Sequence, residues 1–204
     1  MRHALDRWFH VNDDYFDESG AVNNPPVDLT KVNTKNCISG HFGHKGYFIY
    51  QRYPKIFRGF RARQRYRAFM FLRDPLTMRC SLYRHQLKVG KTKHHDLATA
   101  IMPFNNYYAR ILHVNENNWK DRIDQYFFVG IADELQQSFD ILGKLIGKPH
   151  IELPNTNTTQ INQATSSEAL TAEQVAKFKE ENELDYKIFN YAKDRMAELG
   201  QGLS

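Results

Sequence analysis

One junction between a strand pattern and a helix pattern constrains this chain more than any other feature. An apolar, aromatic run at residues 68–72 is typical of a buried strand, and Arg73, Asp74 and Pro75 follow it directly. Proline is well tolerated in the first turn of a helix, because its missing N–H would have no helical partner there. The pattern therefore predicts a strand, a tight turn and a helix over residues 75–88.

Polar side chains at this junction are suited to an anion. Arg73 comes directly after the strand, and Ser81 lies eight residues later, two turns into the helix. Open α/β folds bind ligands outside the carboxyl ends of their strands, and an arginine with a hydroxyl near a helix start binds anions well. Arg73 and Ser81 are therefore candidate phosphate ligands, and Asp74 is expected to brace the turn. The alternative is that Arg73 pairs with a nearby carboxylate and that Ser81 is an ordinary helical residue.

A second strand–helix pattern follows further along the chain. Residues 126–131 form a short apolar run of strand type, and residues 132–146 continue as an amphipathic helix. Two buried strands separated by helices indicate an α/β chain with a parallel sheet, although the glycine-rich phosphate loop that usually opens such a sheet does not occur. Before the first junction we expect a loop-like, polar segment over 1–36, with a short helix near 4–9, and a short strand within 32–39. Between the two strand–helix patterns we expect a helix from 97 broken at Pro103 and mostly helical structure over 111–126. The chain then continues with a long loop over 147–170 and a helical region opened by a capping box at Thr171.

The composition fits a folded globular chain. With 204 residues, of which 41% are hydrophobic, one domain with a sizeable core is expected. The net charge of +5 is compatible with an anionic partner but too small to indicate nucleic acid. Cys37 and Cys80 are expected to be free thiols, with a bridge as the alternative. No apolar run is long enough for a membrane span and no signal-peptide core occurs, so a cytoplasmic location is expected unless a membrane anchor is missing from this sequence.

Three motifs occur in an order that resembles one enzyme family. The first motif is Gly40-His41. The second covers residues 71–83 and consists of a strand, Arg-Asp-Pro and a serine. The third covers residues 126–135 and consists of a Tyr-Phe-x-Val-Gly strand followed by a Glu-Leu helix start. Over residues 35–195 the chain resembles the carbohydrate sulfotransferases that use 3′-phosphoadenosine-5′-phosphosulfate (PAPS), particularly the branch containing the heparan 2-O-sulfotransferases.

The resemblance implies a fold, an activity and roles for three residues. It implies an α/β fold of the P-loop-NTPase-like sulfotransferase type, incomplete in this chain, with a short parallel sheet flanked by helices. The chain would be a single domain (1–204), with a polar arm at 1–34 and the family-like core at 35–198. His41 would be the catalytic base, and Arg73 and Ser81 would hold the 3′-phosphate of PAPS, with a carbohydrate or glycan as acceptor and no metal or nucleic acid. Without the downstream motifs, the favoured interpretation of His41 is a residue that satisfies turn hydrogen bonds beside Gly40 and Gly43.

Two positions depart from the family pattern. Residues 1–40 contain no Pro-Lys-Thr/Ser-Gly loop for the 5′-phosphosulfate, and Met78 stands where branch members often have an arginine, with Arg79 one residue later. Because of the first departure, there is an alternative function: the chain would be an inactive, sulfotransferase-like protein that binds nucleotide or glycan. The arginines between Arg58 and Arg67 are typical of a solvated face, with glycan docking as the alternative. They also suggest a nucleic-acid-binding protein as a third hypothesis. That third hypothesis does not explain the junction motif.

Overall fold

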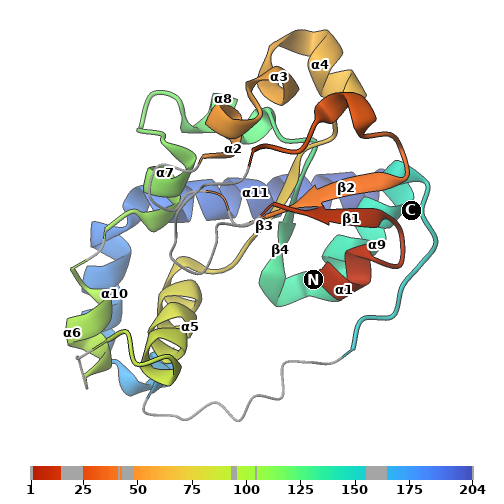
Figure 1. Ribbon diagram of the computed structural model, residues 1–204. Coiled ribbons are helices and arrows are strands. Elements are labelled where there is room, and N and C mark those ends of the chain that lie inside the picture. Colours follow the sequence, from red (N-terminus) through yellow and green to blue (C-terminus); the bar gives the residue numbers. More distant parts are fainter. Residues whose placement is uncertain are drawn as a thin grey trace.

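The computed structural model describes residues 2–14, 25–40, 42, 48–92, 96–103, 105–154 and 165–203, apart from the side chains of residues 60, 62, 63 and 168. Within these residues the fold is of the α/β class and mostly helical, with two small sheets of two strands each (Figure 1). The predicted α/β class is therefore confirmed at this level.

Both sheets are parallel pairs. Strand β1 (His10–Asp13) pairs with β2 (Asn36–Ser39), and β3 (Phe69–Leu72) pairs with β4 (Phe128–Ile131). The parallel pairing of β3 and β4 confirms the prediction from the two apolar runs. Strand β1 differs from the expectation of a loop-like segment before residue 36. Its sequence is polar at both ends and too short for an alternating pattern, so no local signal marks it as a strand.

Helices account for most of the remaining described residues. They are α1 (Arg2–Leu5), α2 (Ile49–Arg52), α3 (Pro54–Phe57), α4 (Gly59–Arg65), α5 (Pro75–Lys88), α6 (Leu97–Ile101), α7 (Tyr107–Leu112), α8 (Trp119–Asp124), α9 (Leu135–Ile146), α10 (Ala172–Glu181) and α11 (Glu183–Gln201), with short 3-10 turns at Leu29–Lys31, Ala132–Glu134 and Ser167–Ala169.

Helix α5 begins and ends where its sequence predicts. Asp74 is the N-cap, because its Oδ1 accepts a hydrogen bond from the Thr77 N–H at 2.9 Å, and Pro75 occupies the first turn. At the other end Gly90 has a φ of 66°, a left-handed conformation that favours glycine. The N–H of Gly90 bonds to the Leu87 carbonyl, and the next N–H bonds to the Gln86 carbonyl. This pair of bonds is the Schellman motif, which satisfies carbonyls that the helix leaves open.

The second strand pair lies at the centre of the main hydrophobic core. All four residues of β4 are buried, and α9 and α11 both contact this strand. The Phe71 ring on β3 lies over its register partner Gly130, where a Cβ would come within 2.7 Å of that ring. The same ring stacks on Phe139 of α9, with centroids 5.3 Å apart. Glycine at position 130 therefore allows an aromatic contact between sheet and helix.

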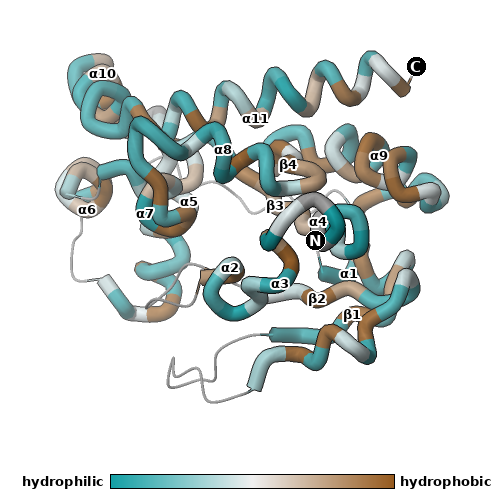
Figure 2. The backbone as a smooth tube through the Cα atoms, turned by 90° about the horizontal axis from the view of Figure 1, so that it is seen from above, coloured by the Kyte–Doolittle hydropathy of each residue, from teal (hydrophilic) through white to brown (hydrophobic). Residues whose placement is uncertain are grey.

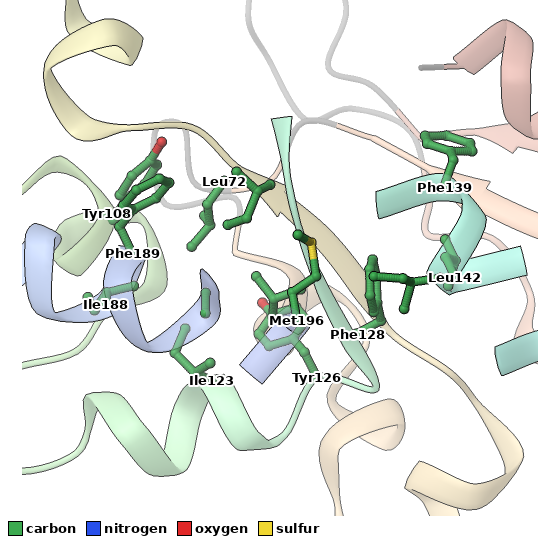
Figure 3. Packing of buried hydrophobic residues seen from close by; sticks show 14 of the residues in the cluster. Leu72, Tyr108, Ile123, Tyr126, Phe128, Phe139, Leu142, Ile188, Phe189 and Met196 are labelled. Carbon is green, nitrogen blue, oxygen red and sulfur yellow. The ribbon is translucent and has the colours of Figure 1, made fainter. Parts of the chain in front are cut away.

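Helices α9 and α11 and the N-terminal segment complete this core. The apolar face predicted for residues 132–146 is confirmed, because Phe139 and Leu142 of α9 are buried in the cluster. Figure 3 shows these two side chains near β3 and β4, with Met196 of α11 against Phe128. In Figure 2 the brown, hydrophobic stretches of α9 lie beside β4. A second, smaller cluster joins α5, α6 and α10, and its buried members are Leu76, Cys80, Tyr83, Leu97, Ile101 and Phe178.

The segment after α7 departs from the expectation of mostly helical structure over residues 111–126. His113 ends α7 in a left-handed conformation (φ 55°), and α8 starts only at Trp119. The capping box predicted at Thr171 is confirmed at the start of α10. Across the described helices, none combines the length and apolar character that crossing a membrane requires.

Candidate functional site

The carboxyl ends of β3 and β4 meet at one edge of their sheet. Leu72, the last residue of β3, is in register with Ile131, the last residue of β4. The residues that follow the two strands are therefore brought together: Arg73 and Asp74 after β3, and Asp133 shortly after β4. This edge is where parallel sheets present ligand-binding side chains.

The Arg73 guanidinium lies between a hydroxyl and a carboxylate. Its Nη1 donates a hydrogen bond to Ser81 Oγ at 3.3 Å, and its Nε lies 3.3 Å from Asp133 Oδ1. The two predicted phosphate ligands are thus neighbours in the structure. The side chain of Arg73 is 31% exposed and that of Asp133 is 39% exposed, so solvent reaches both groups. The sequence alternative, in which Arg73 pairs with a nearby carboxylate, is also present in the structure.

Asp133, which follows β4, contacts both residues that follow β3. Its Oδ2 accepts a hydrogen bond from the Asp74 N–H at 3.0 Å, while Oδ1 faces Arg73. Asp74 in turn uses its own carboxylate to cap α5. The expectation that Asp74 braces the turn is confirmed, and the turn is fixed from both sides.

A side-chain hydroxyl satisfies the backbone at the end of each strand. The Tyr108 hydroxyl of α7 accepts from the Arg73 N–H at 3.0 Å and donates to the Arg73 carbonyl at 2.7 Å. The Ser138 hydroxyl of α9 does the same for Ile131, at 2.8 Å and 3.0 Å. Burial raises the pKa of Tyr108 well above its ordinary value, so this hydroxyl stays protonated and keeps its donor. Both strand ends are therefore held rigidly under the candidate site.

Met78 stands where the sulfotransferases that this sequence resembles often have an arginine, and its side chain is apolar. Met78 packs against the main core, while Arg79 is buried, with its guanidinium carbon 5.9 Å from the centre of the Tyr107 ring. Burial lowers the pKa of Arg79 from its ordinary value. Arg79 is thus a buried residue of α5 that stacks on α7 and not a substitute at the sheet edge.

The proposed base lies outside the described residues. His41 follows Gly40, which the structure does describe at the end of β2. A Cβ at Gly40 would collide with the Asp14 carbonyl oxygen at the end of β1. Glycine at this position is therefore explained by the close approach of two backbones, whatever the role of the histidine.

Sequence reasoning missed Asp133 and Tyr108. Asp133 follows a predicted strand in the same way as Arg73, so the carboxyl-end rule applied to both strands would have found it. Tyr108 lies 35 residues from Arg73 in a helix without a motif, and no local pattern marks its contact.

The chemistry available at this edge is anion binding. The guanidinium and the serine hydroxyl supply hydrogen-bond donors to one ligand oxygen or to two neighbouring ones.

Among the residues the structure describes, no three His, Cys, Asp or Glu side chains are grouped to hold a metal ion. Cys37 and Cys80 are free thiols, as expected from the sequence, and the structure shows that both are buried.

Comparisons with known proteins add no relative. No protein-family model, no curated protein and no solved structure matches this chain.

Proposed function

We propose that this chain is a PAPS-dependent sulfotransferase acting on a carbohydrate hydroxyl, with a sheet of the P-loop-like sulfotransferase type. The observation that carries the proposal is the 3.3 Å hydrogen bond between Arg73 Nη1 and Ser81 Oγ, at the carboxyl end of a parallel strand pair. These are the two residues that the sequence motif assigns to the 3′-phosphate of the nucleotide. Their contact supports that assignment, because one phosphate group would reach both donors.

The proposed reaction transfers a sulfuryl group between two oxygens. The acceptor oxygen forms a new bond to sulfur, the bond from sulfur to the 5′-phosphate oxygen breaks, and adenosine 3′,5′-bisphosphate leaves. His41 takes the proton of the acceptor hydroxyl, because an imidazole with a pKa near 6.5 is a workable base at neutral pH. Arg73 and Ser81 orient the nucleotide and balance part of its charge.

Nucleotide binding tests the assignment of Arg73 and Ser81. Adenosine 3′,5′-bisphosphate is titrated calorimetrically beside adenosine 5′-monophosphate, which lacks the 3′-phosphate. Arg73→Ala should weaken binding of the bisphosphate by about 10- to 100-fold, the loss expected for a hydrogen bond to a charged group, and Ser81→Ala by about 2- to 10-fold. Neither change should affect the monophosphate.

Transfer of labelled sulfate from PAPS to a panel of glycans then tests the activity. His41→Ala should abolish transfer while the affinity for bisphosphate stays unchanged. Lys179→Ala, an exposed lysine on α10, is the control for loss of one positive charge. The enzyme proposal fails if the native chain neither binds the bisphosphate nor transfers sulfate.

A second candidate is a protein that binds the nucleotide without turning it over. It is favoured by the sequence of residues 1–40, which contains no Pro-Lys-Thr/Ser-Gly loop for the 5′-phosphosulfate. Bisphosphate binding that depends on Arg73, together with no transfer to any acceptor, would establish this function instead.

A further inference from the structure

The charges of this chain are divided very unevenly along its length. Residues 29–73 hold 11 of the 28 Lys and Arg residues and none of the 23 Asp and Glu residues, so the rest of the chain carries a net charge of −6. The moderate overall charge of +5 therefore conceals one strongly basic segment. Such a segment attracts anionic partners locally, even where the whole molecule does not.

Four arginines of this segment form an exposed surface that we call the arginine ridge: Arg58, Arg61, Arg65 and Arg67. Arg61 and Arg65 are four residues apart on α4 and so share one helix face. Within the described residues, none of the four forms an ion pair with a carboxylate. Their positive charge is therefore available to a partner.

The ridge lies at the opposite end of the strand from the Arg73 site. Arg67 precedes β3 and Arg73 follows it. The four-residue strand between them spans about 13 Å, at about 3.3 Å per residue. Figure 1 shows α3 and α4 at the end of the molecule where β3 begins, whereas α5 leads away from the other end. The ridge is therefore a surface separate from the proposed nucleotide site.

The side chains around the ridge favour one class of anion. Arg65 lies over one face of the Tyr66 ring at 5.6 Å and Arg67 over one face of the Phe127 ring at 4.8 Å, so the two arginines already occupy ring faces on which a nucleic-acid base would stack. Among the described residues the large hydrophobic side chain that is exposed is Val89, which follows α5 and not α4. Among the described side chains of the ridge and of α4, no large apolar one is therefore exposed for insertion into a membrane surface. An arginine fork binds sulfate and carboxylate oxygens two at a time.

We propose that the arginine ridge is a docking surface for a sulfated glycan chain, distinct from the site of sulfuryl transfer. The choice of a sulfated polymer rests on the proposed function, because a carbohydrate sulfotransferase produces such chains. Docking at the amino end of the strands leaves the carboxyl end free for nucleotide and acceptor. The ridge thus retains the polymer after a sulfate group has been added.

A triple variant of the full chain tests this proposal. Arg58→Gln, Arg61→Gln and Arg65→Gln are combined, since these exposed side chains make no hydrogen bond to another residue that the structure describes. The probe is a fluorescent, size-defined heparin fragment at about 0.1 M salt. The triple variant should bind it about tenfold more weakly, because three exposed charges each contribute a fraction of a kcal/mol. It should also show a weaker dependence of affinity on salt.

The matched control removes three charges at the other end of the molecule. Lys88→Gln, Lys91→Gln and Lys179→Gln are exposed positions at the ends of α5 and α10, and their combination should leave affinity for the probe within about twofold. Equal weakening by the two triple variants would overturn the proposal, as would equal binding of a desulfated fragment.

Two further experiments distinguish a glycan from other polyanionic partners of the ridge. Displacement of the fragment by duplex DNA at equal charge concentration would show a nucleic-acid surface, and co-sedimentation with anionic phospholipid vesicles that depends on the ridge would show a membrane surface. Either outcome overturns the glycan proposal. Titration with adenosine 3′,5′-bisphosphate keeps the two hypotheses distinguishable: the ridge variant should bind it normally, whereas Arg73→Ala should lose nucleotide and keep the glycan.

Discussion

The Tyr108 hydroxyl satisfies both backbone polar groups of Arg73, accepting from its N–H at 3.0 Å and donating to its carbonyl at 2.7 Å. A residue of α7 therefore completes the end of β3, where the strand ladder stops. The backbone of Arg73 cannot rotate without breaking both bonds. The Tyr108 hydroxyl thus fixes the backbone from which the Arg73 side chain reaches Ser81, and no ligand would need to touch that hydroxyl.

Removal of that hydroxyl should destabilise the chain and loosen the site. Tyr108→Phe leaves a backbone N–H and carbonyl without partners, which is expected to cost about 1–3 kcal/mol in the free energy of unfolding. Urea denaturation measures this change. Tyr107→Phe, at the neighbouring half-buried tyrosine, is the control and should cost less than about 0.5 kcal/mol. Equal losses for the two variants would show that the bonds to Arg73 do not matter.

Asp133 and a bound anion should compete for the same guanidinium. The Arg73–Asp133 pair is partly exposed and 3.3 Å apart, so its ion pair is worth about 0–1 kcal/mol. Asp133→Asn removes the negative charge but keeps an oxygen that accepts from the Asp74 N–H. We expect adenosine 3′,5′-bisphosphate to bind this variant a few-fold more tightly in calorimetric titration. Weaker binding would instead assign Asp133 the role of positioning Arg73.

The local signals in this sequence predicted the elements well. Pro75 and Gly90 mark the start and end of α5, and Thr171 marks the start of α10, because a fixed backbone angle or a capping side chain acts over only a few residues. Strand β4 was predictable because all four of its residues are buried and apolar. In contrast, β1 has no such composition and depends on pairing with β2.

The candidate site was predicted only in its local part. Arg73 and Ser81 are eight residues apart on one strand–helix unit, so a motif captures both. Asp133 and Tyr108 reach the same place from 60 and 35 residues away, through the register of β3 with β4 and the docking of α7. Tertiary packing sets those contacts, and periodicity along the chain does not report it.

The two cysteines should be unreactive in the folded chain. Cys37 is 8% exposed and Cys80 is 1% exposed, and burial raises the pKa of each thiol to about 11. At pH 8 the thiolate fraction is then about 100-fold smaller than in a free cysteine. An aromatic disulfide reagent should label neither thiol rapidly until urea unfolds the chain, and should then label both. The single variants Cys37→Ala and Cys80→Ala assign any fast reaction, which would contradict the burial of that thiol.

Asp185 caps a helix to which it does not belong. This buried residue of α11 accepts hydrogen bonds from the N–H groups of Tyr108 and Ala109 in the first turn of α7, each at 2.9 Å. The cap positions α7 and therefore the Tyr108 hydroxyl at the end of β3. Burial nevertheless raises the pKa of Asp185 above its ordinary value of 3.8, because the cost of desolvating the charge exceeds the gain from these bonds.

The raised pKa fixes the sign of a pH effect on stability. The folded state holds the proton of Asp185 more tightly than the unfolded state, so this contribution to stability is complete below pH 3.8 and is lost as the pH rises through the raised pKa. Asp185→Asn cannot titrate and is the reference. The free energy of unfolding of the native chain, measured in urea from pH 3 to pH 8 relative to this variant, should fall as the pH rises. A difference that instead grows with pH would mean that the two backbone donors outweigh burial, and that the ionised carboxylate is the form that holds α7 in place.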